Sequence, residues 1–303
     1  METIRIGTRK SKLALWQAEN VADQLQQAGY PTELVLKETK GDKVLDVSIA
    51  KIGSKGVFTE ELEEQLASGA VDIAVHSAKD MQSRLPSGFE IIAFGAREKI
   101  NDVIVSEKPI DLSKNLVLGT SSTRRVALFR HFYPNVETVD VRGNLQTRLE
   151  KMKSGLCDGL VLAYAGVHRM GYDPMIRYEL ASDEFIPAVG QGSIAIEAHD
   201  SLSQEKKDAI RSALNHPSTE SRLLAERAYL ARLEGGCSIP VFALANWAGD
   251  QLVISGGIVS LDGTQRIVKT LRGNEPISLG NELAEEILKA GGDKILAEIR
   301  NQL

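Results

Sequence analysis

The stretch GTRKSKLALWQAENVADQLQQAG, residues 7–29, decides the fold class of this chain. It follows the strand-like segment TIRIG, and its apolar residues roughly keep helical spacing until Gly29 ends the pattern. The same order of strand, turn and helix returns in NLVLGTSSTRRVALFRHF, residues 115–132. IGTRKSKLALW and LGTSSTRRVALF align over their length with one inserted residue.

A second pair of segments supports this repeat. SGAVDIAVHSA, residues 68–78, and SGLCDGLVLAYA, residues 154–165, both read as a helix end, Ser-Gly, an aspartate and a buried strand. One such pair could arise by chance, because turns between strands and helices resemble one another. Two pairs in the same order predict two similar α/β lobes.

From Ser218 onward the chain has a different order of predicted helices and strands. A helical pattern, STESRLLAERAYLARLE, stops at Gly235 and Gly236, and a last helical stretch begins at about Leu279. Between them lie three alternating segments, IPVFALANW, QLVISGGIVS and QRIVKTLRG. This order predicts an α+β domain with an antiparallel sheet. No low-complexity linker is visible, so we expect the domains to touch.

Composition limits the class of protein. The 303 residues are 43% hydrophobic and 25% charged, which indicates a soluble globular protein with two or three domains. METIRIGTRK lacks the apolar region of an export signal, and no uninterrupted apolar run reaches the roughly 18 residues of a membrane span. We therefore expect a cytoplasmic protein with no membrane partner.

Charge and metal-binding residue types exclude further classes. The formal net charge of -5 argues against a general nucleic-acid binder, so an anion site must come from local clustering. Cys157 and Cys237 form no CxxC motif, and the five histidines form no HExxH motif. We expect neither a disulfide framework nor a metal site.

Both repeats carry hydroxyl residues and arginines in the turn after the strand. These are Thr8, Arg9 and Ser11 in the first, and Thr120, Ser121, Ser122, Arg124 and Arg125 in the second. Free N–H groups at a helix N-terminus favour anions, and a guanidinium group binds a carboxylate or phosphate with two hydrogen bonds. One such turn is better explained by a serine N-cap and solvated arginines. Two matched turns favour anion binding, and we expect them to face a shared cleft.

Three further arginines lie near predicted joints between elements. Arg142 ends a strand before an Asn144 cap, Arg148 lies in the first turn of the next helix, and Arg169 follows the strand of the second repeat. A cation in a first turn opposes the helix dipole, and a bound anion would offset that cost at Arg148. Alone, each reads as a surface arginine. The six arginines together predict a site for several carboxylates.

HSAKD, residues 76–80, ends the strand VDIAV, and α/β lobes bind ligands beyond the carboxyl ends of their strands. Asp80 is therefore either a carboxylate at the cleft mouth or the N-cap of a following turn, and its position alone does not decide. For His76 we favour local packing or capping over catalysis.

Cys237 stands in LEGGCSIP, just after a predicted helix. The negative end of the helix dipole gives no help to a reactive thiolate, so the residue is poorly placed as a nucleophile. A permanent thioether needs no such activation, and Gly235 and Gly236 are expected to leave room for a ligand. The alternative is a small residue in a loop.

GTRKSKLALWQ, KIGSKGVF, HSAKD, GTSSTRR, VRGNLQTRL, PAVGQG and LEGGC follow one another over essentially the whole chain. This set closely resembles the porphobilinogen deaminase (hydroxymethylbilane synthase) family, and LEGGC resembles its cofactor-attachment segment. The resemblance implies a transferase of tetrapyrrole, porphyrin and heme biosynthesis. Such an enzyme condenses four porphobilinogen molecules head to tail on a covalent dipyrromethane primer, releases ammonia at each step and finally releases hydroxymethylbilane.

The resemblance also implies a fold. It is α/β, with two lobes like type II periplasmic binding proteins and a C-terminal α+β domain with a small antiparallel sheet. Domain 1 would comprise residues 1–95 and 189–214, domain 2 residues 96–188, and domain 3 residues 218–303. The family further implies a cytoplasmic monomer.

The resemblance assigns roles to single residues. The catalytic aspartate falls on Asp80, and the cysteine that carries the dipyrromethane falls on Cys237. Other primer contacts fall on Ser77, Lys79, Asp80, Thr120, Ser122, Arg124, Arg125 and Arg148. Substrate contacts fall on Arg9, Ser11, Arg142, Arg148 and Arg169, and the mobile active-site loop falls on Lys51, Lys55 and Phe58. Every pyrrole ring carries an acetate and a propionate, which explains the need for many arginines.

Two positions depart from the family pattern. Gln82 stands where HS-x-KD-x-P has its proline, with Pro86 only later, and this puts the backbone path after Asp80 in doubt. Glu60 stands where many members have lysine.

From the residues alone, two other classes stay open. A soluble binding protein for a small anion would have the same lobes, but the third domain with LEGGC argues against it. A thiol hydrolase would need a histidine linked to Cys237 by a motif, and none is present.

Overall fold

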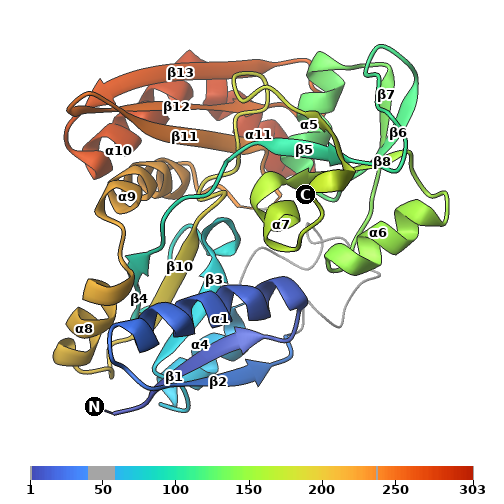
Figure 1. Ribbon diagram of the computed structural model, residues 1–303. Coiled ribbons are helices and arrows are strands. Elements are labelled where there is room, and N and C mark those ends of the chain that lie inside the picture. Colours follow the sequence, from blue (N-terminus) through green and yellow to red (C-terminus); the bar gives the residue numbers. More distant parts are fainter. Residues whose placement is uncertain (1, 40–58, 237, 303) are drawn as a thin grey trace. The chain divides into compact units, whose positions relative to one another are not determined.

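The computed structural model describes residues 2–39, 59–236 and 238–302 (Figure 1). These residues form two compact units. The first contains 2–39, 59–98 and 192–220, and the second contains 99–191, 221–236 and 238–302. No helix in these described ranges is long and apolar enough to cross a membrane.

The first unit is an α/β lobe. Its elements are β1 (Ile4–Arg9), α1 (Lys12–Gln27), β2 (Thr32–Lys37), α4 (Glu60–Ala67), β3 (Ile73–Ser77), η1 (Ala78–Asp80), β4 (Phe89–Phe94), β10 (Ile194–His199) and α8 (Gln204–Leu214). The sheet has the order β2-β1-β3-β10-β4, in which β1 is parallel to β2 and β3, and β10 is antiparallel to β3 and β4. Apolar residues of α1 and α8 pack on one face, and Leu62 and Leu66 of α4 pack on the other.

The second unit begins with a lobe of the same design. Its elements are β5 (Asp102–Val105), β6 (Leu116–Gly119), α5 (Thr123–Phe132), β7 (Val136–Val139), α6 (Leu145–Lys153), β8 (Gly159–Ala163), α7 (Tyr164–Arg169), η2 (Asp173–Met175) and β9 (Ile176–Glu179). The sheet order β7-β6-β8-β5-β9 and its strand directions match those of the first lobe strand for strand. The predicted twin lobes are confirmed.

The repeated aspartate accepts the same kind of hydrogen bond in both lobes. The Asp72 carboxylate accepts a hydrogen bond from the backbone N–H of Arg5 (2.7 Å), and the Asp158 carboxylate accepts one from Val117 (2.8 Å). Each aspartate follows a helix that ends with a Ser-Gly pair whose glycine has positive φ. The repeated pattern therefore encodes a helix stop and a side-chain bond to the neighbouring strand.

The fourth strand of each sheet lies just after the chain has crossed from the other lobe. In the second lobe it is β5, which directly follows β4 of the first, and in the first lobe it is β10, which follows β9 of the second. Both run antiparallel to their neighbours. The chain therefore passes between the two lobes twice.

The C-terminal part is an α+β arrangement, drawn in orange and red in Figure 1. It comprises α9 (Pro217–Arg232), β11 (Val241–Ala248), β12 (Gln251–Val259), β13 (Arg266–Gly273), α10 (Pro276–Ile287), η3 (Leu288–Gly292) and α11 (Asp293–Gln302). The three strands form an antiparallel sheet. Phe242 and Val259 of this sheet pack in one core with Phe129 of α5, which explains why both parts fall in the second unit. The predicted fold class is confirmed.

The end of α9 corrects one expectation. The left-handed residue there is Glu234 (φ 51°), and the N–H of Gly235 bonds to the carbonyl of Leu230 (2.9 Å). A Cβ atom on Gly235 would lie 2.6 Å from Leu230 and 2.8 Å from Val241. The space that Gly235 was expected to leave for a ligand is filled by the chain's own side chains.

Candidate active site

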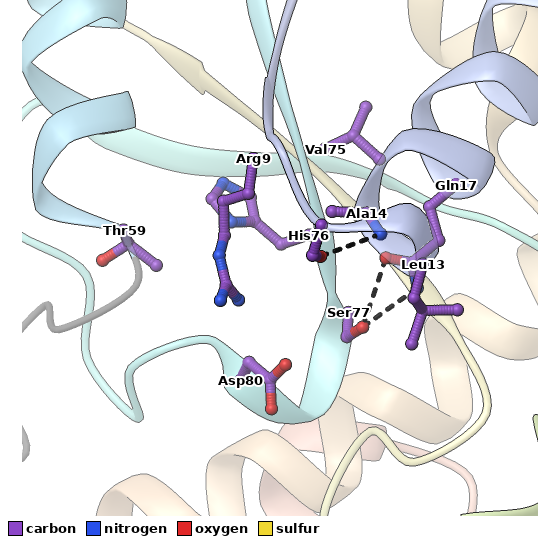
Figure 2. Close-up of a pocket in the computed structure, with 10 residues that line it drawn as sticks. Arg9, Leu13, Ala14, Gln17, Thr59, Val75, His76, Ser77 and Asp80 are labelled. Carbon is purple, nitrogen blue, oxygen red and sulfur yellow. Dashed lines mark hydrogen bonds between the residues drawn. The ribbon is translucent and has the colours of Figure 1, made fainter. Parts of the chain in front are cut away.

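A pocket in the first unit lies at the carboxyl ends of β1 and β3 (Figure 2). Its lining brings together four residues predicted for the site, Arg9, Ser11, Ser77 and Asp80. The remaining lining residues are Leu13, Ala14, Gln17, Thr59, Val75 and His76. In Figure 2 the Arg9 guanidinium group and the Asp80 carboxylate point into the same space. A cation and an anion therefore face one opening in a single lobe.

Asp80 ends the short helical turn η1 rather than beginning a helix. The residue is exposed, and within the described part of the chain its carboxylate has no hydrogen bond or ion pair. The structure therefore gives no support to the alternative that Asp80 serves as an N-cap. Its carboxylate is available to a ligand in the pocket.

Ser11 and Gln17 tie α1 to the pocket wall. Ser11 is the N-cap of α1 and accepts a hydrogen bond from the N–H of Ala14 (3.3 Å). The Gln17 side-chain amide donates to the Ser77 hydroxyl (2.9 Å), as the dashed lines in Figure 2 show. Gln17 was not among the residues predicted for the site. Its signal was an amide on the apolar face of a helix, where burial requires a polar partner.

His76 lies in the pocket wall and contacts the buried Glu197 of β10. Its Nε2 atom is 3.0 Å from a Glu197 oxygen, which is close enough for an ion pair but not aligned as a hydrogen bond. Glu63 of α4 lies near this pair, and burial raises the pKa of its carboxyl group. The preferred interpretation of His76 as a packed residue agrees with its burial, although its ring also lines the pocket.

In the second unit, Arg124 and Arg125 form a buried cluster with Asp102 of β5. Each guanidinium group donates to one Asp102 oxygen, at 2.7 and 2.8 Å, and each also donates to a backbone carbonyl. The Gln191 amide donates to the same carboxylate (2.9 Å). Burial alone would raise the pKa of Asp102, but the two guanidinium groups hold it well below its usual range. Asp102 was not predicted as the partner of these two arginines.

The hydroxyl residues of the second turn have structural bonds. Ser122 is the N-cap of α5 and accepts from the N–H of Arg125 (3.4 Å), and the Ser121 hydroxyl donates to the carbonyl of Val141 (2.8 Å). Thr120 is buried and accepts from the N–H of Ser122 (3.3 Å). The N-cap alternative is therefore correct for Ser122 and does not exclude a ligand contact.

Arg142 has an uncommon environment for a charged side chain. It follows β7 and is only 7% exposed. Its Nη1 atom is buried and has no hydrogen-bond partner among the described residues. A buried guanidinium N–H without an acceptor is costly, so the group is suited to a negatively charged ligand.

Arg148 lies in the first turn of α6, as predicted, whereas Arg169 lies differently from the prediction. Arg148 is the fourth residue of α6, and its Nε donates to the Gly143 carbonyl (2.8 Å), which offsets part of its expected cost within the chain. Arg169 is the last residue of α7, where the helix dipole favours a cation. It is therefore not at a strand-to-helix joint as expected.

The predicted loop residues Lys51, Lys55 and Phe58 lie outside the described residues, as does Cys237. Their assigned roles stay predictions. Lys79 is partly buried in η1, between Ser77 and Asp80. No cluster of residues suited to a metal ion is found in the described ranges.

Solved structures show distant similarity to periplasmic ligand-binding domains. The periplasmic VFT2 domain of BvgS from Bordetella pertussis aligns with a TM-score of 0.45 and 16% identity over 76% of this chain and 92% of that one. A TRAP periplasmic solute binding protein from Desulfovibrio salexigens gives a TM-score of 0.42 and 12% identity over 69% and 71%.

Sequence comparisons are far closer. The family model described as porphobilinogen deaminase, dipyrromethane cofactor binding domain, matches residues 4–207, and the model of the C-terminal domain of porphobilinogen deaminase matches residues 221–289. The porphobilinogen deaminase of Desulfosudis oleivorans is 57% identical over 305 residues, covering 99% of this chain and 98% of that protein. That of Cytophaga hutchinsonii is also 57% identical, over 100% and 98%. The chain belongs to the porphobilinogen deaminase family.

Proposed function

We propose that Asp80 stabilises the cationic form of porphobilinogen in the reaction of this family, and that arginines bind the acetate and propionate groups of the pyrrole chain. The enzyme is a transferase of tetrapyrrole biosynthesis that condenses four porphobilinogen molecules on a dipyrromethane primer and releases hydroxymethylbilane. The observation that carries the proposal is the Asp80 carboxylate, which faces the pocket without a bond to described residues.

The role of Asp80 follows from charge. When porphobilinogen loses ammonia, its pyrrole ring and methylene carbon become cationic. A carboxylate that faces the pocket stabilises this charge as it develops, and it needs no reorganisation at that moment. The nearby Arg9 carries the opposite charge and is suited to a carboxylate of the same ring.

The residues present fit the dipyrromethane. Its acetate and propionate groups need N–H donors, and Arg124 Nε, Arg125 Nε and Arg142 Nη1 are buried N–H groups that lack acceptors among the described residues. When bound, the dipyrromethane supplies the free pyrrole α-carbon to which the first substrate unit is joined. We propose that Cys237 carries it through a thioether. Its other contacts would be Ser77, Lys79, Asp80, Thr120, Ser122, Arg124, Arg125 and Arg148.

Substrate units would be bound by Arg9, Ser11, Arg142, Arg148 and Arg169, with Lys51, Lys55 and Phe58 contributed by the loop. Arg142 has the strongest physical reason for this role, because its buried N–H group needs an acceptor. The charges of Arg124 and Arg125 are partly offset by Asp102. These two residues would therefore contribute their remaining N–H groups more than net charge.

The intact mass of the purified protein tests the anchor. We expect an excess that matches one dipyrromethane, and its loss in Cys237→Ser. Cys157→Ser is the matched control, because Cys157 is buried and burial raises the pKa of its thiol. A primer retained by the Cys237 variant would contradict the assignment.

We also propose a cytoplasmic monomer with domains at 1–95 with 189–214, 96–188 and 218–303. A thiol that must receive the primer is best kept reduced in the cytoplasm, and all the proposed contacts come from one chain. Cell fractionation tests the compartment, analytical ultracentrifugation tests the oligomeric state, and limited proteolysis tests the domain boundaries.

A further inference from the structure

The backbone conformation around Asp80 determines the direction in which its carboxylate points. Within the described part of the chain the side chain has no hydrogen bond or ion pair, and it lines the pocket as an exposed group. Whatever fixes residues 78–82 therefore also fixes where the charge points.

The two sides of this turn are held in different ways. Before Asp80, the backbone N–H of Ala78 donates to the carbonyl of Ser193 (2.9 Å), which continues the pairing of β3 with β10. After Asp80, the side-chain amide of Gln82 donates to Glu63 Oε1 (3.0 Å) and to Thr59 Oγ1 (3.2 Å). Met81, which follows Asp80, is buried, and its N–H also donates to the Ala78 carbonyl within the short turn (3.4 Å). The first side is therefore held by the sheet, whereas the second is held by this turn and by the bonds of the Gln82 side chain to α4 and the residue before it.

The partners of Gln82 belong to a rigid part of the lobe. Thr59 immediately precedes α4, is buried and itself lines the pocket, and Glu63 lies in the first turn of α4. Leu62 and Leu66 of the same helix are packed against the sheet. Gln82 thus joins the segment after Asp80 to Glu63 of the packed helix α4 and to Thr59, which precedes that helix.

The backbone conformation of Met81 can be favoured in a second way. Met81, between Asp80 and Gln82, is extended (φ -71°, ψ 141°). A proline at position 82 would favour this same conformation of Met81 by steric repulsion, without any side-chain hydrogen bond. One backbone path can therefore be held by two unrelated physical means, which makes the path itself testable.

We propose that Gln82 is a positioning residue for Asp80: its amide, bonded to Thr59 and Glu63, holds the backbone in the path that directs the Asp80 carboxylate into the pocket. The inference rests on the proposed role of Asp80. Gln82 contacts no reacting atom, and its effect reaches the reaction only through the turn.

The test compares steady-state kinetics of the full-length holoenzyme with Gln82→Ala, Gln82→Pro and Asp80→Asn. Gln82→Ala should lower kcat by about 5- to 30-fold, which is the rate equivalent of one to two typical hydrogen bonds, with little change in KM. Gln82→Pro should restore kcat to within about threefold of the unmodified enzyme. A merely structural role would not predict this rescue, because proline forms neither bond.

Gln26→Ala is the matched control, since Gln26 also donates its amide to a threonine hydroxyl (Thr32, 2.7 Å) in the same unit but outside the pocket lining. Its single hydrogen bond is exposed, so Gln26→Ala should lose less stability in thermal unfolding than Gln82→Ala, and it should keep its kcat. An unchanged kcat in Gln82→Ala, or an equal fall in the alanine and proline variants, would overturn the inference. A near-normal kcat in Asp80→Asn would instead refute the proposed role of Asp80.

Discussion

Replacement of Arg142 by leucine should separate binding from stability. Arg142 is 7% exposed, and the buried Nη1 of its guanidinium group has no acceptor among the described residues. An unpaired buried N–H costs about 1–3 kcal/mol, so Arg142→Leu should leave thermal unfolding of the primer-free protein unchanged or shift it upward. Loss of a desolvated partner for a substrate carboxylate costs about 2–5 kcal/mol. At about 1.4 kcal/mol per tenfold, kcat/KM should fall by roughly 30- to 4,000-fold.

The assay is ammonia release at varied porphobilinogen concentration, with intact mass to establish whether the primer is attached. Arg177→Leu is the matched control, because Arg177 lies on β9 in the same unit and is exposed, and its donations among the described residues go to nearby backbone carbonyls. Arg177→Leu should leave kcat/KM and thermal stability nearly unchanged. A normal kcat/KM in Arg142→Leu, or a fall of similar size in Arg177→Leu, would refute the reasoning from burial.

Three further substitutions test other features. Asp80→Asn should lower kcat far more than it raises KM. Thermal stability should stay almost unchanged, because the carboxylate has no bond to described residues. A loss of stability with normal kcat would instead indicate a capping role. Glu63→Gln should gain stability relative to the unmodified protein as pH rises from below about 4.5 to 7. The reason is that a carboxyl group with a raised folded pKa favours folding when protonated and loses that contribution as it ionises; denaturant midpoints at both pH values check the sign. Glu234→Gly should raise the free energy of unfolding by roughly 0.5–1 kcal/mol by relieving the left-handed backbone (φ 51°), and a fall would show that the side chain of Glu234 outweighs the strain.

The twin lobes could be predicted because their signals are local. A strand with Gly-Thr at its carboxyl end, a serine N-cap and an apolar helical face specifies one β-turn-α unit wherever it occurs, and the structure has such caps at Ser11 and Ser122. The repeated pattern of Ser-Gly and aspartate could be recognised from the sequence, but the structural role of its aspartates could not. The bonds from Asp72 and Asp158 to neighbouring strands appear only when those strands are paired.

The site was predicted less completely than the fold. Asp80, Arg9, Ser11 and Ser77 were identified from motifs, and the structure places all four around one pocket. Gln17 was missed, because an isolated glutamine in a helical pattern has no motif.

The backbone after Asp80 also could not be predicted. Gln82 left that path in doubt, and the path depends on bonds to Thr59 and Glu63, which lie 23 and 19 positions earlier in the chain. Such bonds depend on the mutual placement of two elements, which the local pattern does not contain.

The sequence by itself determined the repeated α/β units, the α+β C-terminal part and the family, because each depends on residue types at short, fixed spacing. Only the tertiary structure decided which arginines are already paired. Arg124 and Arg125 share Asp102, 22 and 23 positions away, whereas Arg142 is buried with an N–H group that lacks an acceptor among the described residues. The physical reason is that the charge a ligand meets depends on desolvation and on partners, and both are set by packing between segments distant in the chain.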